Sequence, residues 1–184
     1  MAAASAVAAV PMVASGGTHT LLLSESGVVK AVGDNAVGQL GDTSTNPSTA
    51  GVSVSGLTGV ISVAAGDTHS LALKLDGTVW AWGANDKGQL GLGSTDANPH
   101  ATPVQVPGLS GIVAIAAGAE HSVALGFDGS VRVWGSNSDS QTGGPCGTAG
   151  VSVPSPTLVQ TTSTGPGCVP STPLAGVTSI AAGG

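Results

Sequence analysis

The chain contains very few aromatic and charged residues. Among its 184 residues there is no Tyr, one Phe and three Trp, only 8% are charged, and 30 are Gly. Because large side chains are so scarce, the apolar residues are mostly Ala, Val and Leu, which let neighbouring backbones approach closely. The composition therefore excludes a core built on aromatic packing.

Positive charge is scarcer than negative charge. Four Lys and Arg stand against ten Asp and Glu, which gives a formal net charge of −6 at pH 7. This sign opposes the phosphate contacts on which nucleic-acid binding depends. No apolar run approaches the ~20 residues that span a bilayer, because small or polar residues interrupt each one. We expect neither nucleic acid nor membrane insertion.

Three copies of one unit make up most of the chain. The best-formed copy, residues 62–93, contains Ala-Ala-Gly-Asp-Thr-His-Ser, then Asp-Gly-Thr-Val-Trp-Ala-Trp-Gly, then Gly-Gln-Leu-Gly. The histidine column contains His19, His69 and His121, separated by 50 residues (19 to 69) and 52 residues (69 to 121). A fourth copy begins with Ser-Ile-Ala-Ala-Gly at 179–183. A period of this length indicates a propeller or a solenoid.

Each unit is predicted to contain four short strands. In the second unit the strands are expected at 60–64, 70–74, 78–83 and 102–106. The Asp-Gly pair at 76–77 predicts a two-residue hairpin, because the twist of such a turn requires positive φ. Prolines beside the last strand place it at a sheet edge. The pattern predicts an all-β fold of four-stranded antiparallel propeller blades.

The order and spacing of these motifs resemble the regulator of chromosome condensation repeat family. The resemblance covers nearly the whole chain and is most specific in the second unit. The first unit departs from it at Ser26, Lys30 and Val32, and the third unit reads Ser-Gln-Thr-Gly at 140–143 in place of Gly-Gln-Leu-Gly. The resemblance implies a seven-bladed ring, of which this chain would supply about half.

The repeats define the expected domain organisation. Residues 1–56, 57–108 and 109–173 are assigned to three blades of one propeller domain, the third with an irregular insertion, and 174–184 to the first strand of a fourth. Repeat arrays need neighbours and caps to be stable. We therefore expect a fragment of a longer protein, and self-association through exposed blade faces is the alternative.

The repeated His and Trp residues are expected to be structural. Each column histidine begins a strand after a small-residue corner, where an imidazole can tie neighbouring backbone groups together. The tryptophans are expected to pack within the blades. No paired carboxylates or Cys/His cluster accompanies them, so we predict no catalytic residue, no cofactor, no metal site and no enzyme. The predicted structural residues are His19, His69, His121, Trp80, Trp82 and Trp134.

The chain has two cysteines, Cys146 and Cys168, both in the irregular segment of the third unit. A disulfide between them would span 22 residues (146 to 168) and stabilise the fold by roughly 3 kcal/mol in the chain-entropy model. We expect this bridge, and two independent thiols are the alternative. The bridge suggests an oxidising compartment. We expect a secreted or surface-displayed bacterial protein, with a cytoplasmic location as the alternative.

The function is expected to be binding. The repeated framework contrasts with unrepeated, Ser/Thr/Pro-rich connections at 42–56, 92–108 and 142–173, and loops on a rigid scaffold commonly carry function. We predict a non-catalytic scaffold that binds a protein partner of unknown identity through these loops. The family resemblance implies one alternative, guanine-nucleotide exchange on a small GTPase. Inhibition of an enzyme such as a beta-lactamase by surface contact is another.

Overall fold

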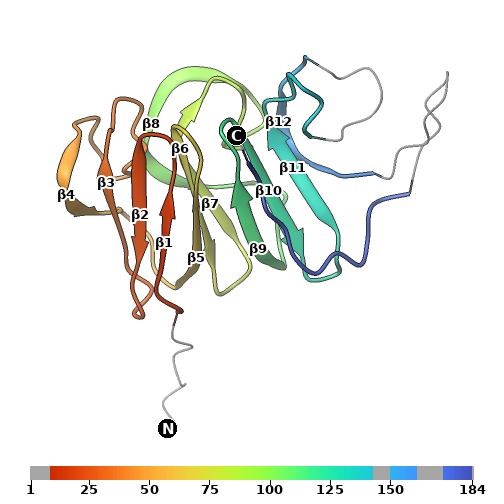
Figure 1. The fold of residues 1–184 in the computed structure, drawn as a ribbon, viewed down its shortest axis with the longest axis horizontal. Helices are drawn as coiled ribbons and strands as arrows, with labels where there is room; N and C mark the ends of the chain where they lie inside the picture. The colour runs from red at the N-terminus through yellow and green to blue at the C-terminus, as the bar shows by residue number, and fades with distance from the viewer. Residues whose placement is uncertain (1–8, 143–149, 161–171, 184) are drawn as a thin grey trace, which may run out of the picture.

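In the computed structural model, residues 9–142, 150–160 and 172–183 are described, and they form three four-stranded antiparallel sheets in chain order (Figure 1). The first sheet contains β1 (Met12–Ser15), β2 (His19–Leu23), β3 (Val29–Gly33) and β4 (Ser48–Ser53). The second contains β5 (Val60–Ala65), β6 (His69–Lys74), β7 (Val79–Asn85) and β8 (Asp96–Gln105). The third contains β9 (Ile112–Ala117), β10 (His121–Gly126), β11 (Val131–Gly135) and β12 (Val153–Leu158). The predicted all-β class with four-stranded antiparallel blades is confirmed.

Tight turns join the second and third strands of each sheet. Gly27, Gly77 and Gly129 have φ of 73°, 77° and 77°, the left-handed region that favours glycine. In the second sheet the Asp76 carboxylate accepts hydrogen bonds from the backbone N–H of Thr78 (3.0 Å) and from its hydroxyl (2.6 Å). The turn residues therefore close the hairpins locally. The loop is longer than the predicted two residues, because the Lys74 N–H donates to the Thr78 carbonyl and leaves three residues between them, of which Gly77 has positive φ.

The outermost strands differ most from the sequence-based expectation. β8 begins at Asp96, six residues before the predicted start. It pairs with β7 through two register shifts, in which Gly83 lies opposite His100 and Asn85 lies opposite Asp96. These irregular pairings extend the strand through a stretch with two prolines that interrupts the usual alternation. The predicted edge position is correct, because β8 is hydrogen-bonded on one side alone.

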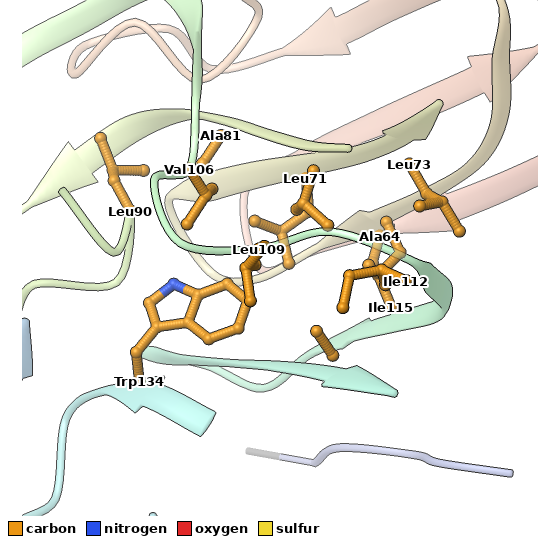
Figure 2. Close-up of a cluster of buried hydrophobic side chains, with 12 residues drawn as sticks. Ala64, Leu71, Leu73, Ala81, Leu90, Val106, Leu109, Ile112, Ile115 and Trp134 are labelled. Atoms are coloured by element: carbon orange, nitrogen blue, oxygen red, sulfur yellow. The ribbon is translucent and has the colours of Figure 1, made fainter. Parts of the chain in front are cut away.

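The hydrophobic core lies between neighbouring sheets. Figure 2 shows the cluster between the second and third sheets, in which Trp134 lies close to Leu109 and faces side chains of the second sheet. Leu71 and Leu73 from β6 and Ile112 from β9 also belong to it, and all three are at most 3% exposed. Burying a Leu or Ile side chain contributes about 1.5–3 kcal/mol, so the contacts between sheets are a major source of stability.

Residues 174–183 lie against the third sheet, as the blue C-terminal segment of Figure 1 shows, but they form no strand in the described structure. Their apolar side chains pack on four core residues of β10 and β11. The innermost strand of each sheet pairs with the strand that follows it, whereas residues 174–183 pair with no strand in the described structure. The segment therefore has the packing of an innermost strand without its hydrogen-bond ladder. Its apolar members are Leu174, Val177, Ile180 and Ala182.

The predicted disulfide partners, Cys146 and Cys168, lie outside the described residues.

In the described part of the chain, no helix has the length and apolar character needed to cross a membrane.

Candidate functional site

The column histidines connect each sheet to the next. His19 and His69, the first residues of β2 and β6, are 3% and 0% exposed. The Nε2 atom of His19 lies 2.7 Å from the Ser70 hydroxyl of the second sheet. His69 makes the same contact with Ser122 of the third sheet, at 3.0 Å. The sequence analysis expected the imidazoles to hold nearby backbone, whereas the structure shows them bound to a side chain one sheet away.

A backbone carbonyl completes each of these contacts. The Ser70 hydroxyl donates to the Gln39 carbonyl oxygen at 2.8 Å, and the Trp82 indole Nε1–H donates to the same oxygen at 2.8 Å. The Gln89 carbonyl accepts equivalent bonds from the third sheet. Serine and glutamine were missed as structural residues, although both recur in fixed columns of the repeat. The equivalent donors are Ser122 at 2.9 Å and Trp134 at 2.8 Å.

The hydrogen-bond directions fix the histidine tautomer. A carbonyl can only accept, so the single hydroxyl proton of Ser70 is donated to Gln39 and its oxygen must accept from His19 Nε2–H. The Nδ1 atoms of His19 and His69 are therefore unprotonated, and they have no hydrogen-bond partner among the described residues. These buried imidazoles donate hydrogen bonds that connect two neighbouring sheets.

Burial also keeps the histidines neutral. It lowers the pKa of His69 from 6.5 to about 3, with a smaller contribution from the neighbouring histidines. Burial lowers the pKa of His19 to about 4, although Asp34 opposes the shift, and burial also lowers the pKa of His121. A buried, neutral imidazole that donates to an internal hydroxyl has no access to a substrate, so the geometry assigns His19 and His69 no proton-transfer role.

The three tryptophans lie in two different environments. Trp82 and Trp134 are fully buried between sheets. Trp80 is half-buried beside the hairpin turn, where its Nε1–H donates to the Thr78 hydroxyl at 3.3 Å and the Lys74 ammonium lies 5.4 Å from its ring centroid. Trp80 therefore supplies a partly exposed aromatic surface with a cation above it.

Buried asparagines hold the loops that follow the third strands. Asn35 Oδ1 accepts from the Leu40 backbone N–H at 2.9 Å, and its Nδ2 donates to the carbonyls of Ser44 (3.0 Å) and Asn46 (3.1 Å). Asn85 accepts from Leu90 in the same way, at 3.3 Å. One side chain thus anchors both ends of a loop, so the loop is presented in a defined conformation.

The outermost strands carry much of the exposed surface of the sheets. In β4 (48–53) four of six residues are exposed, and in β8 (96–105) six of ten. Their exposed side chains are mostly small or polar, with Val104 as a 39% exposed apolar residue. Two of the three predicted binding segments, 42–56 and 92–108, contain these strands. Part of the third segment, 142–173, lies outside the described residues.

An acidic hollow of 360 Å³ lies where the second and third sheets meet the C-terminal segment. Asp67, Glu120, His121 and Asp139 line it, together with small residues. In the described ranges, no three His, Cys, Asp or Glu side chains lie close enough together to hold a metal ion. The hollow adds negative charge to this face but no catalytic arrangement that the geometry supports.

Comparisons with known proteins agree with this architecture. A family model described as regulator of chromosome condensation (RCC1) repeat matches residues 26–73 and 76–125. A second model of the same description matches residues 60–89 and 112–141. Together with the three four-stranded sheets, these matches account for the repeated His, Asp-Gly and Gly-Gln-Leu-Gly columns.

Solved structures of longer proteins match the same fold. A crystal structure of Kap60 bound to yeast RCC1 (Prp20) is 28% identical with a TM-score of 0.74, covering 94% of this chain and 39% of that chain. Human WBSCR16 is 27% identical with a TM-score of 0.69, covering 80% and 37%. Prp20p from Saccharomyces cerevisiae, studied with its binding to Gsp1p and histones, is 24% identical with a TM-score of 0.68, covering 82% and 38%. The chain thus spans less than two fifths of each.

Proposed function

Because this chain belongs to the regulator of chromosome condensation (RCC1) repeat family, we propose that it is a non-catalytic scaffold that binds a protein partner through its outermost strands and the loops before them. One observation supports the proposal above all. The inner strands form a buried frame held by the His–Ser–Gln hydrogen bonds, whereas the outermost strands β4 and β8 are exposed and differ in sequence from one sheet to the next. Similar structures support the proposal, since one holds Kap60 bound to yeast RCC1 (Prp20), and the same yeast protein has been studied for its binding to Gsp1p and histones.

The frame is suited to presenting a fixed surface. The His–Ser–Gln contacts join sheets near their inner strands, and Asn35 and Asn85 hold the loops that lead to β4 and β8. A preformed surface binds with a smaller entropic cost than a flexible one. The variable residues on a rigid frame are therefore those expected to select the partner.

The charge of the chain favours a basic partner surface. With ten acidic and four basic side chains, the formal net charge is −6, and the acidic hollow lined by Asp67, Glu120 and Asp139 adds to this on one face. Complementary charge accelerates encounter more than it strengthens the final complex. We expect the association rate to fall as salt concentration rises.

The test combines partner capture with substitutions on β8. A partner cross-linked to the wild-type chain is identified, and its affinity is measured for the N98K/V104K variant, whose changes lie at exposed positions of β8. The matched control is Phe127→Lys, at an 84% exposed residue of the β10–β11 hairpin. We expect at least tenfold weaker binding for the β8 variant and unchanged binding for the control.

The outcome separates this function from the alternatives. If the affinity for the partner is unchanged after substitution of β8, and also after matching substitutions in β4, the proposal is wrong. Faster nucleotide release from a candidate small GTPase would instead support exchange activity. Circular dichroism of each variant establishes that the fold is retained.

We further propose that the protein is located outside the cell or at the cell surface. This proposal rests on the two cysteines, Cys146 and Cys168. Thiol alkylation of the denatured, unreduced protein followed by mass spectrometry tests it. A mass with no added alkyl group supports an oxidising compartment, and two added groups contradict it.

A further inference from the structure

Each outermost strand contains a bulge in the same place. In the second sheet, Ala81 and Gly83 of β7 are separated by one residue, whereas their partners, Val104 and His100 of β8, are separated by three. The pairings of β4 and β12 have the same two extra residues in the same columns. A bulge that recurs in this way re-aims side chains or ends strand pairing. The three bulges are residues 49–51, 101–103 and 154–156.

The preceding sheet holds the first residue of the bulge in β8 and in β12. The Ala101 carbonyl accepts a hydrogen bond from the Thr43 N–H at 2.9 Å, and a Cβ on Gly38 would lie 2.5 Å from the Ala101 Cα. The Pro154 carbonyl accepts the equivalent bond from the second sheet, also at 2.9 Å. The bulge is thus fixed on its inner side, and its second residue, the apex, is exposed. The three apices are Ala50, Thr102 and Ser155.

Proline removes a hydrogen-bond donor from the outer edge of two of these strands. The Val106 N–H donates to β7 at 2.8 Å. Because the backbone groups of an antiparallel strand alternate in direction, Val104 also faces β7, and Pro103 and Gln105 face away from it. Pro103 has no N–H, and Pro156 occupies its column in β12. A strand added at either edge would lose a hydrogen bond at the point where pairing would begin.

Side-chain hydroxyls occupy backbone groups at the apices of the other two strands. In β4, whose bulge contains no proline, the Ser48 hydroxyl donates to the Ala50 carbonyl at 2.8 Å and accepts from the Ala50 N–H at 3.3 Å. In β12 the Thr157 hydroxyl donates to the Ser155 carbonyl at 3.1 Å. Local hydrogen bonds of this kind compete with strand pairing. An added strand would have to displace them.

The outermost strands present an almost uncharged surface. β4 and β12 contain no Asp, Glu, Lys or Arg, and β8 contains Asp96 alone. The Asp96 carboxylate accepts from the Asn85 Nδ2–H at 2.8 Å and lies 3.1 Å from His100 Nε2. Natural sheet edges are protected from strand addition by charged residues, by bulges or by proline. Here the bulges and prolines supply that protection, and the exposed side chains are small and neutral.

We propose that the partner of the outermost strands is a folded protein that places its side chains against the bulge apices, and that it does not add a strand to the sheets. This inference rests on the proposed function, because it specifies how the proposed surface binds. Recognition by strand addition depends on a continuous row of outward backbone groups. The prolines and the hydroxyl contacts interrupt that row, so the apex side chains are what the surface offers.

The apices also indicate the kind of partner surface that fits. They are one Ala, one Thr and one Ser, whose small side chains leave room for larger side chains of the partner. Aromatic residues and Arg commonly supply such anchors in protein interfaces. The apices share one column of the repeat but differ in side chain, so we expect them to select the partner. The net charge of the chain then affects the rate of encounter more than the contact itself.

A strand-forming peptide tests the closed edges without the partner. The probe is a fluorescently labelled peptide of alternating Thr and Val, which favours extended structure. We expect no binding by the wild-type chain below roughly 100 µM. Pro103→Val restores an outward N–H, and we expect it to bind the peptide at least about tenfold more tightly. Equal affinities overturn the proposal, and so does binding to the wild type that protects the N–H groups of an outermost strand from hydrogen exchange.

Two neighbouring substitutions separate side-chain contact from strand addition in the complex with the cross-linked partner. Thr102→Lys changes an exposed apex and keeps the backbone donors, so we expect at least about tenfold weaker binding. Pro103→Val changes the next residue and adds a donor, so the affinity should stay within about twofold of the wild type. Strand addition predicts stronger binding by Pro103→Val. Circular dichroism establishes that both variants keep the fold.

The failure of this inference is distinguishable from the failure of the proposed function. If N98K/V104K weakens partner binding but Thr102→Lys does not, the outermost strands bind the partner and the apices do not, so this inference alone is wrong. Unfolded fragments of the partner that bind as tightly as the folded protein also overturn it. If no substitution in β4 or β8 changes the affinity, the proposed function itself is wrong. The peptide measurement reports on the closed edges in either case.

Discussion

The two ends of the same strand, β7, have different environments. Trp82 is fully buried, and its indole donates to a backbone carbonyl of the first sheet. Trp80 lies two residues earlier on the same face, yet it is half-buried beside Lys74. Strand alternation puts both side chains on one face. The first sheet covers the end of β7 that holds Trp82, and Trp80, beside the hairpin turn, is covered less completely. Identical residue types therefore have different energetic roles.

The largest expected effect separates these two tryptophans. Trp82→Ala removes a fully buried side chain and its hydrogen bond, and we expect a loss of about 3–5 kcal/mol in the free energy of unfolding. Trp80→Ala should cost about 1 kcal/mol or less, because the side chain is partly solvated and its cation contact is exposed. Urea unfolding of both variants measures the difference. Equal losses would contradict the assignment of distinct environments.

Acidification should weaken the contacts between sheets. The folded-state pKa values of His19 and His69 are lowered to about 4 and about 3, while the unfolded chain titrates near 6.5. The unfolded state therefore binds more protons below pH 6.5. Stability is full above that pH and falls by about 1.4 kcal/mol per pH unit for each histidine until its folded pKa is reached.

Urea unfolding at pH 7.5, 6.0 and 5.0 measures this dependence. A His69→Gln variant is the control, since Gln can donate a hydrogen bond but does not titrate. We expect its stability to depend less steeply on pH than that of the wild type. A wild-type stability that stays constant down to pH 5 would show that the histidines are not buried in neutral form.

The serine column should distinguish Ser70, which lies between two sheets, from Thr20, which has the same place in the first sheet but bonds an exposed side chain. Ser70→Ala leaves the buried Nε2–H of His19 without its acceptor, which costs about 1–3 kcal/mol. Thr20→Ala removes a hydroxyl that bonds the exposed Ser15 side chain at 3.2 Å, so the monomer should lose less than about 0.5 kcal/mol. Urea unfolding of both variants measures the two losses. A Thr20 effect as large as that of Ser70 would contradict this distinction.

The smallest expected effect concerns a turn in the third unit. Ser140 has φ of 64°, in the column where Gly38 and Gly88 have 84° and 75°. Glycine removes the strain of a left-handed residue but loses more chain entropy on folding. We expect Ser140→Gly to stabilise the monomer by about 0.5 kcal/mol, and Gly88→Ser to destabilise it by more. The thermal midpoints of both variants test this, and a stabilised Gly88→Ser variant would refute it.

The sequence predicted the fold well because its signals are local. Asp-Gly turns require positive φ at Gly77 and Gly129. Short apolar strands joined by such local turns pair with the strands next to them in the sequence, which gives an antiparallel sheet. β8 was predicted poorly, because its bounds depend on irregular pairing with β7 across two register shifts. The role of Ser70 was also missed. Its position after a histidine is visible in the sequence, but the histidine that it binds is 51 residues away.

The sequence by itself determined the repeat, the hairpins and the four-stranded blades, since these follow from glycine conformation and from alternation within a few residues. The tertiary structure alone decided which members of a column are buried. Trp80 and Trp82 have the same chemistry and share a strand face, and their burial depends on how closely the neighbouring sheet approaches. In the same way, Val13 and Val63 share a column, and the first sheet covers Val63 while no described residue covers Val13.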